Sequence, residues 1–327
     1  MARIAPSSRL ESGSDSGLHN VRIYPVATLA VASLRELRRK VKSVKSTQQI
    51  TKAMKMVAAA RLRRAQARIL GARPFADKMA SMLADVLWQV MDVNNDGVLT
   101  ADELNHPLLH GRRGGPQGLL LITADRGLCG AFNTNLIKKA LEFLRQNADQ
   151  GVQLFCVGRK GRDYFRRAGV PIRAESVGIF NKPGYAQAEV IGREVMDFFV
   201  QQQASGVTIL YTEFKSAIQQ RVVEAPLLPL TPPPRPVQKH WEAPFIYEPE
   251  RAKLMEALFP RFLMAQVFRA LLESYASEMG ARMTAMENAS KNAKELIAGL
   301  TLTANKIRQA AITKEISELV GGAEALN

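Results

Sequence analysis

Residues 264–310, MAQVFRALLESYASEMGARMTAMENASKNAKELIAGLTLTANKIRQA, carry one apolar repeat almost without interruption. The repeat advances in steps of three and four residues: Met264, Phe268, Leu271, Tyr275, Met279, Met283, Met286, Ala289, Ala293, Leu296, Leu300, Thr303, Ile307 and Ala310. Because an α-helix rises about 1.5 Å per residue, this spacing predicts a single helix roughly 70 Å long. A narrow apolar stripe on so long a helix requires an equally long partner helix.

A second helical pattern, near the other end of the chain, supplies that partner. Its apolar residues recur at helical spacing and resume after a phase slip at residues 47–49: Leu34, Leu37, Val41, Val44, Ile50, Met54 and Val57. Ser33 and Glu36 form a capping-box pattern at its start, and Pro74 marks a kink or joint within it. The two patterns predict a long antiparallel coiled coil, with an ordinary helical bundle as the alternative.

Between these helices the apolar period changes. Short apolar runs at 118–123, 152–157 and 207–212 alternate with helical patterns near 133–147, 159–168 and 185–203. This alternation predicts a small Rossmann-like α/β domain with a mostly parallel sheet. The expected order along the chain is a poorly ordered extension at 1–32, a helix at 33–91, a loop at 92–103, the α/β domain at 104–230, a proline-rich linker at 231–249 and a helix at 250–327.

Charge is concentrated in the first helix. The chain has a formal net charge of +15, and residues 33–73 hold 13 Lys and Arg against a single acidic residue, Glu36. Such a concentration of positive charge favours binding to an acidic partner surface. No apolar run is long enough to predict a membrane-spanning helix, so a membrane role would be peripheral. Cys129 and Cys156 match no zinc motif and are expected to be buried thiols.

No motif of an enzyme active site is found. The chain lacks the P-loop, the dinucleotide-binding glycine pattern, the zinc protease motif and the nucleophile elbow. Residues 125–130, DRGLCG, follow a predicted strand and precede a predicted helix, where helix amides can bind a phosphate. Without a Lys and a Ser or Thr in the P-loop positions, this pattern is only a weak indication of a phosphate site.

Three long blocks closely resemble the gamma subunit of F-type ATP synthases. They are residues 33–66, SLRELRRKVKSVKSTQQITKAMKMVAAARLRRAQ, residues 122–137, ITADRGLCGAFNTNLI, and residues 281–326, which begin ARMTAMENASKNAKEL. The resemblance implies a rotor shaft that couples ion-driven rotation of a membrane ring to conformational changes in a catalytic hexamer. It implies a non-catalytic subunit of a proton-transporting ATP synthase, with no required cofactor.

The resemblance also implies partners and a location. The partners are the alpha and beta subunits of the hexamer, the epsilon subunit and the membrane ring of c subunits, with no nucleic acid. The α/β domain would be the foot that stands on the ring. Membrane association would be through the complex alone, on the cytoplasmic face of a bacterial inner membrane in preference to a plastid or mitochondrion.

Candidate contact residues lie on both helices. The outward charges of the first helix suit contacts that break and re-form, because exposed ion pairs are worth only about 0 to 1 kcal/mol. The alternative is a face that contacts only solvent. The residues are Arg35, Arg38, Arg39, Lys42, Lys45, Lys52 and Lys55. Met54 is expected in the coiled-coil seam or against the stator, with the seam favoured. Arg282, Gln309 and Thr313 are expected at exposed positions of the second helix. By resemblance they bond to a loop of a catalytic subunit, with an ordinary exposed helix position as the alternative for each.

Residues 92–103, DVNNDGVLTADE, depart from the gamma pattern. They match the calcium-loop pattern D-x-[DN]-x-[DN]-G-x5-E, with these candidate ligands: Asp92, Asn94, Asp96, Val98, Thr100 and Glu103. A single loop without a paired partner is unusual for such sites, so a polar turn is the alternative. A calcium-binding protein and a basic coiled coil that binds nucleic acid are the competing functions. Residues 33–73, the basic part of the first helix, contain no aromatic residue for base stacking.

Overall fold

The structure is a computed structural model that describes residues 33–93, 106–181, 183–202, 204–231 and 251–324. The predicted extension at 1–32, the linker at 231–249 beyond its first residue and most of the 92–103 loop lie outside these ranges. Residues 42–299 form one compact unit, and the described parts of 1–41 and 300–327 form a second unit. The two units are described separately.

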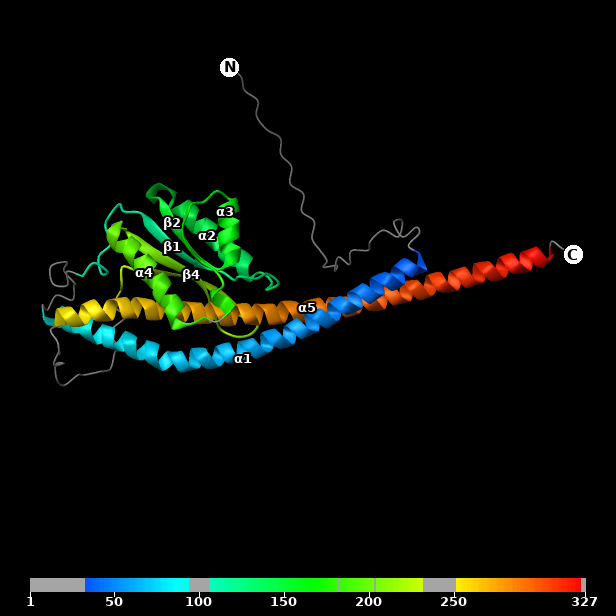
Figure 1. The fold of residues 1–327 in the computed structure, drawn as a ribbon, viewed down its shortest axis with the longest axis horizontal. Coiled ribbons are helices and arrows are strands. Elements are labelled where there is room, and N and C mark those ends of the chain that lie inside the picture. The colour runs from blue at the N-terminus through cyan, green and yellow to red at the C-terminus, as the bar shows by residue number, and fades with distance from the viewer. Residues whose placement is uncertain (1–32, 94–105, 182, 203, 232–250, 325–327) are drawn as a thin grey trace, which may run out of the picture. The chain divides into compact units, whose positions relative to one another are not determined.

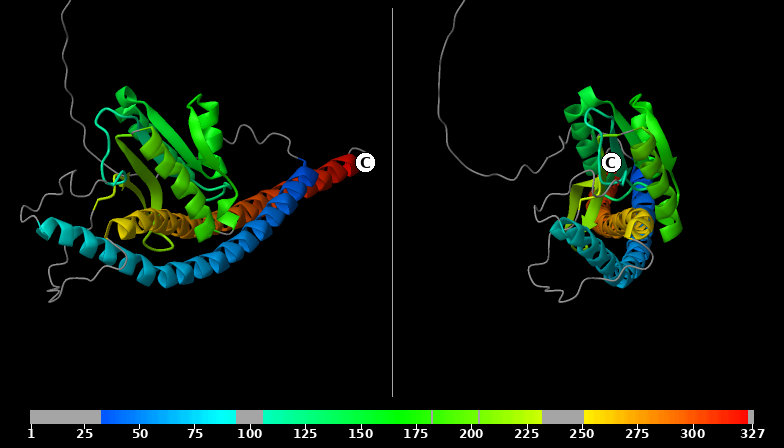
Figure 2. Two further views of the ribbon diagram at one scale, coloured as in Figure 1. Left: turned by 60° about the vertical axis from the view of Figure 1, so that its left-hand side comes forward. Right: turned by 90° about the vertical axis from the view of Figure 1, so that its left-hand side faces the viewer.

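The first and last elements along the chain are two long helices, α1 (Leu34–Val93) and α5 (Arg251–Glu324). Within the larger unit they run antiparallel and side by side (Figures 1 and 2). The Gln48 side chain donates to the Ser290 carbonyl over 3.5 Å, and Lys55 forms an ion pair with Glu287. The predicted antiparallel pairing is therefore confirmed. Helix α1 also continues through Pro74 without a break.

The residues of α1 that face α5 keep one unbroken helical repeat, whereas the sequence analysis predicted that the repeat shifts at residues 47–49. In the larger unit the residues toward α5 follow steps of three and four: Gln48, Thr51, Lys55, Ala58, Leu62, Ala65 and Ile69. The predicted seam residues Ile50 and Val57 are instead 57% and 52% exposed. The prediction was wrong because polar side chains occupy seam positions here, where α5 offers a carbonyl and a carboxylate to pair with them.

A five-stranded sheet lies between the helices in the sequence, with the order β3-β2-β1-β4-β5. Its strands are β1 (Gln117–Ile122), β2 (Val152–Val157), β3 (Ile172–Ser176), β4 (Gly206–Phe214) and β5 (Gln220–Leu228). The first four pair in parallel, and β5 pairs antiparallel with β4. The three predicted strands are β1, β2 and β4. Strand β5 was missed because it contains Pro226, which an edge strand tolerates.

Helices cover both faces of this sheet (Figure 1). On one face α2 (Phe132–Gln146) and α3 (Arg159–Arg167) bury Leu136 and Phe165 against alternate residues of β1 and β2. On the other face α4 (Tyr185–Gln201) and α5 pack against the intervening strand residues. Short 3-10 turns lie at Ala148–Gln150 and Ile179–Asn181. The predicted α/β class with a mostly parallel sheet is confirmed.

Buried contacts fix α5 to the sheet. The Thr212 amide in β4 donates to the Ser274 hydroxyl over 3.2 Å, and the Ser277 hydroxyl donates to the Thr212 carbonyl over 3.1 Å. Both serines are fully buried. Gly192 of α4 allows a further close approach, since a Cβ there would lie 3.1 Å from the Met264 side chain. The sheet domain and α5 are therefore joined by specific hydrogen bonds and tight packing.

Candidate partner-binding surface

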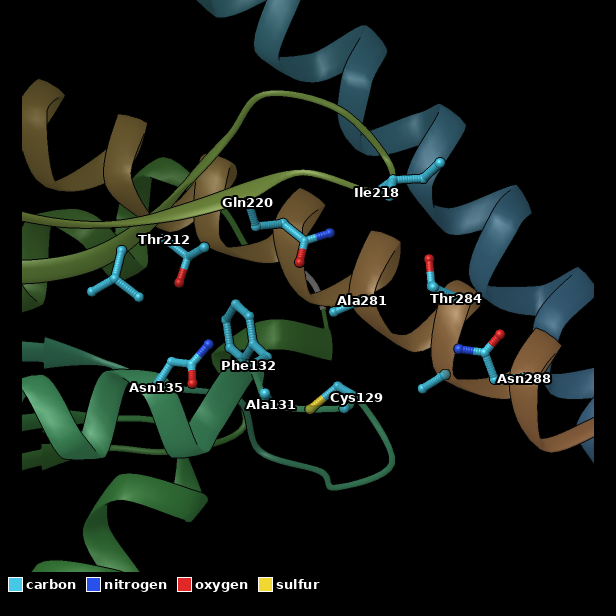
Figure 3. Close-up of a pocket in the computed structure, with 13 residues that line it drawn as sticks. Cys129, Ala131, Phe132, Asn135, Thr212, Ile218, Gln220, Ala281, Thr284 and Asn288 are labelled. Carbon is cyan, nitrogen blue, oxygen red and sulfur yellow. The ribbon is translucent and has the colours of Figure 1, made fainter. Parts of the chain in front are cut away.

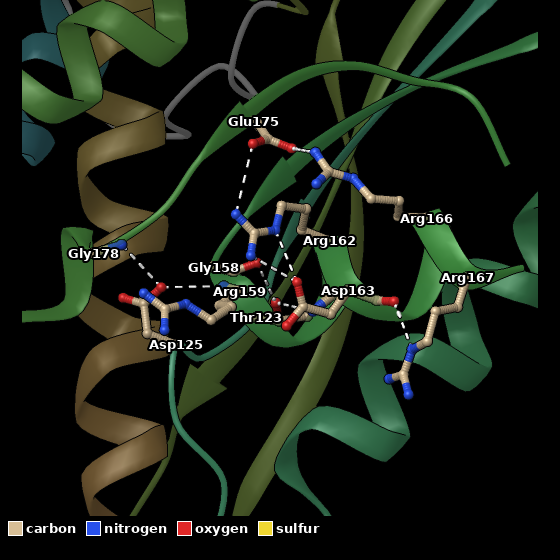
Figure 4. A network of polar contacts seen from close by, with 11 residues as sticks. Thr123, Asp125, Gly158, Arg159, Arg162, Asp163, Arg166, Arg167, Glu175 and Gly178 are labelled. Carbon is tan, nitrogen blue, oxygen red and sulfur yellow. Dashed lines mark hydrogen bonds and ion pairs between the residues drawn. The ribbon is translucent and has the colours of Figure 1, made fainter. Parts of the chain in front are cut away.

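The loop after β1 is held at its start by Asp125. One oxygen of this carboxylate accepts hydrogen bonds from the backbone amides of Arg159, at 3.1 Å, and Gly178, at 2.9 Å (Figure 4). These amides belong to the segments that follow β2 and β3. Asp125 therefore ties together three loops at the carboxyl edge of the sheet, and it sets the direction in which the next residues leave it.

Thr123 and Gly158 make this junction compact. The Thr123 hydroxyl accepts from the Gly161 amide over 2.9 Å and donates to the Val157 carbonyl over 3.1 Å. Gly158 has a φ of +90°, and a Cβ there would lie 2.0 Å from the Thr123 carbonyl oxygen. A larger residue at 158 would therefore require the two loops to separate.

A partly exposed ion-pair network lies beside this junction on α3 (Figure 4). Arg162 contacts Asp163 at 2.7 Å, and Arg166 contacts Glu175 of β3 at 2.7 Å. The Arg162 side chain lowers the pKa of the Asp163 carboxyl. Because these groups are solvated, they orient α3 more than they stabilise the fold.

A buried ion pair holds the middle of the same loop against α5. Arg282 contacts Glu278, one turn earlier on the helix, at 2.6 Å and donates to the Gly127 carbonyl over 3.0 Å. Burial raises the pKa of the Glu278 carboxyl above its usual value, and Arg282 opposes part of that rise. Arg282 is only 9% exposed, so its predicted exposure is wrong. The guanidinium is turned inward because Glu278 and the loop carbonyl both require a donor.

The loop and α1 together border an apolar groove, which we call the α1 groove. It encloses about 440 Å³ and is lined by Ile50, Met54, Val57 and Leu128, with Arg61, Arg126 and Arg282 among its polar neighbours. Leu128 is 63% exposed and has a φ of +65°, a conformation that non-glycine residues adopt at a cost. Met54 lines this groove together with Met279 of α5, and its assignment to the seam or to a stator contact stays a prediction. Exposed apolar side chains gathered in one place are typical of a partner-binding surface.

The predicted basic contacts of α1 fall into two groups. Six side chains are exposed as expected: Arg35, Arg38, Arg39, Lys42, Lys45 and Lys52. Lys55 differs because it is partly buried and pairs with Glu287 across the seam. Its charge is therefore already engaged within the chain, whereas the contacts of the other six with a partner stay predictions.

In the smaller unit, Gln309 and Thr313 lie one turn apart on α5 and are exposed. The Thr313 hydroxyl donates to the Gln309 carbonyl over 3.0 Å. The helix beyond them exposes large apolar side chains: Ile312, Ile316, Leu319 and Val320. Their spacing of four, three and one places them on one face of the helix, which we call the α5 tip face.

The candidate calcium ligands are not tested by the structure. Asp92 belongs to the last turn of α1, and Asn94, Asp96, Val98, Thr100 and Glu103 lie outside the described residues. Within the described ranges, no three His, Cys, Asp or Glu side chains gather as a metal site would require. Among the same residues, no helix has the length and hydropathy of a membrane span.

Sequence reasoning missed the α1 groove and the Glu278 pair. The exposed apolar residues of α1 were assigned to the seam because they continue its approximate period. The signal that could have located them is the charged and polar series at Gln48, Thr51 and Lys55, which keeps an unbroken heptad phase. Glu278 could have been suspected from its position one turn before Arg282 on the most apolar part of α5.

Comparisons with known proteins agree over nearly the whole chain. The ATP synthase family profile matches residues 33–326. An ATP synthase gamma chain from Anaeromyxobacter sp. (strain Fw109-5) is 47% identical over 297 residues, which cover 90% of this chain and 99% of the relative. One from Heliobacterium modesticaldum is 44% identical over 304 residues, with coverage of 90% and 99%.

Solved structures include a similar chain. A chain from the central stalk and c-ring of the Tetrahymena thermophila mitochondrial ATP synthase is 28% identical and has a TM-score of 0.54, covering 74% of this chain and 99% of that chain. Residues 33–326, which the family profile matches, include both long helices and the sheet between them. The chain therefore belongs to the family of ATP synthase gamma chains.

Proposed function

We propose that this chain is the central-stalk rotor subunit of a membrane-associated ATP synthase. In this role the α/β domain is the foot on a membrane ring of c subunits, beside an epsilon subunit. The paired helices enter a hexamer of alpha and beta subunits. Rotation of the ring turns the foot, and the helices carry that rotation to the catalytic sites. The family membership and the central-stalk relative support this proposal.

One observation carries the proposal: the chain joins its foot to α5 by buried hydrogen bonds, yet leaves apolar surfaces uncovered. Ser274 and Ser277 bind the end of β4, so a torque on the sheet reaches α5 through fixed contacts. The α1 groove and the α5 tip face expose large apolar side chains that an isolated chain would be expected to bury. A rigid connection between the sheet and α5, together with exposed apolar surfaces, suits a rotor helix that turns inside a surrounding partner.

The charges of α1 suit a contact surface that moves. The six exposed basic side chains can pair with acidic groups of a partner, and each such pair is worth about 1 kcal/mol or less. Weak individual pairs let a rotor leave one position and reach the next without a large barrier. Salt should therefore weaken this contact more than it weakens the fold of the chain.

The chemistry of ATP formation belongs, in this proposal, to the hexamer. The chain has no phosphate-loop motif, and its part is to couple movements. We place it on the cytoplasmic face of a bacterial inner membrane, attached through its complex. The two bacterial gamma chains are 44% and 47% identical to this chain, whereas the Tetrahymena mitochondrial chain is 28% identical. A nucleic-acid-binding coiled coil would explain the basic helix alone.

Affinity purification of the tagged chain from detergent-solubilised membranes tests the proposal. We expect a complex with ATPase activity that contains a hexameric assembly. A chain with both Val57→Asp and Leu128→Asp should recover much less of it, because each change puts a charge into the α1 groove. The matched control is Val190→Asp, which alters a 56% exposed valine on α4.

Two results would contradict the proposal. One is a tagged chain that purifies alone or with nucleic acid under conditions that keep the ATPase intact. The other is equal recovery of the hexamer with the groove variant and the α4 control, which would remove the groove from the contact surface.

A further inference from the structure

A cavity separate from the α1 groove lies at the carboxyl ends of β1 and β4. It encloses about 230 Å³, and its walls come from the start of α2, the end of β4, the β4–β5 turn and one face of α5 (Figure 3). The chain leaves β1 toward β2 on one side, and β4 lies on the other side. This is the topological switch point of the sheet, the place where open α/β sheets bind ligands.

A buried hydroxyl in this cavity has no partner. Thr212 is 3% exposed, and its side-chain oxygen makes no hydrogen bond, although its backbone groups bond to Ser274 and Ser277. Figure 3 shows this oxygen directed toward Phe132 and Asn135. A buried hydroxyl without a partner is costly, so the position favours a bound molecule that supplies one.

The start of α2 faces the same space. Ala131 precedes the first turn of this 15-residue helix, and no side chain caps that turn. The Phe132 amide at this end already donates to the Cys129 carbonyl over 3.3 Å. The helix dipole makes the same end partly positive, which favours an oxygen that carries negative charge.

The remaining lining is polar but uncharged. Asn135, Gln220, Thr284 and Asn288 provide amide and hydroxyl groups, and no residue that lines the cavity has a carboxylate or cationic side chain. Burial raises the pKa of the Cys129 thiol, which is therefore protonated at neutral pH. Ile218 and Val222 add an apolar wall. Such a site suits a small monovalent anion with a short apolar remainder better than a multiply charged one.

We propose that this cavity binds a small oxyanion, a carboxylate or a singly charged phosphate group, near the N-terminal end of α2 and on the Thr212 hydroxyl. The site is distinct from the contacts that the rotor role uses. A ligand there would touch the foot and α5 at once. It would therefore reinforce the junction through which torque passes.

Titration of the isolated full-length chain with inorganic phosphate and with acetate tests this proposal. Binding is followed by calorimetry and by the backbone amide resonances of α2. We expect saturable binding of at least one of the two anions, with the largest shifts in residues 131–135. Glycerol, a neutral molecule of similar size, serves as the probe without charge.

Two variants and one control separate the cavity from the basic surface of the chain. Thr212→Val removes the hydroxyl at nearly constant volume, and we expect it to weaken binding roughly fivefold to tenfold, as the loss of one hydrogen bond does. Ala285→Leu fills the cavity and should abolish binding. Thr208→Val, on the same strand but outside the lining, should leave binding unchanged.

Three results would overturn the proposal. They are the absence of saturable binding of either anion, binding that is equal in Thr212→Val and the parent chain, and glycerol binding as tight as that of the anions. The second result would assign the anion to the basic side chains of α1. The third would mean that the cavity does not select for charge.

Discussion

At the scale of single residues, Arg282 forms an ion pair with Glu278 of the same chain, whereas the resemblance had assigned Arg282 to a contact with a partner subunit. Arg282 was expected to be exposed, but its guanidinium satisfies a buried carboxylate and a loop carbonyl. The sequence predicts helix positions well because it contains their period. It does not show which way a long side chain turns, since that depends on the loop brought against α5 by the fold.

The buried pair predicts a large effect on stability. Arg282→Ala should lower the free energy of unfolding by about 3 to 5 kcal/mol, because it leaves the Glu278 carboxylate buried without its partner. Urea unfolding of the isolated chain measures this. Gln309→Ala is the control, since an exposed position should change stability by less than about 0.5 kcal/mol. Equal stability of the two variants would show that Arg282 is not a structural residue.

The calcium loop at 92–103 stays a prediction at this scale. If it binds calcium, the carboxylates Asp92, Asp96 and Glu103 supply most of the charge that offsets dehydration of the ion. A single loop should bind weakly, with a Kd on the order of 10⁻⁴ to 10⁻³ M. Calorimetric titration should show this heat for the parent chain and lose it in Glu103→Gln. Flat titrations for both chains would leave the segment as a polar turn.

At the scale of elements, the predicted strands and helices are confirmed where the apolar period is strong. Strand β2 has the bounds 152–157 that the sequence predicted, and β1 and β4 differ by one or two residues at their ends. Strands β3 and β5 were missed because both lie at the edges, where half-exposed residues weaken the apolar signal, and because Pro226 argued against a strand at β5. The seam of α1 was misassigned because polar residues hold three of its positions.

The α5 tip face predicts a separation of folding from coupling. Replacing Ile312, Ile316, Leu319 and Val320 by Ser should leave the melting temperature of the isolated chain nearly unchanged, since these side chains are already exposed. In the reconstituted complex the same variant should pump fewer protons per ATP hydrolysed, because the tip loses its apolar contact with the bearing. Proton pumping and ATP hydrolysis are measured on the same vesicles.

A matched control keeps this prediction specific. Replacing Val190 and Val200 of α4 by Ser also removes exposed apolar side chains but leaves the tip face intact. It should pump as the parent complex does. A tip variant that pumps as many protons per ATP as this control would exclude the tip face from coupling.

At the scale of the whole molecule, the account depends on one connection. The sheet domain is attached to α5 through Ser274, Ser277 and close packing at Gly192, while α5 pairs with α1 within the same compact unit. The sequence predicted the order of these parts and their fold class, because the period changes at each boundary. The attachment itself was not predicted, since small buried serines and glycines leave no periodic pattern.

The most direct test of the rotor role is to watch the foot turn. The hexamer is fixed to a surface, and a bead is attached through a cysteine introduced at the exposed Asp149, far in sequence from α1 and α5. With ATP present, the account predicts stepwise rotation of the bead in one direction, which stops when ATP is removed. ATP hydrolysis at the normal rate with a bead that does not rotate would contradict the account.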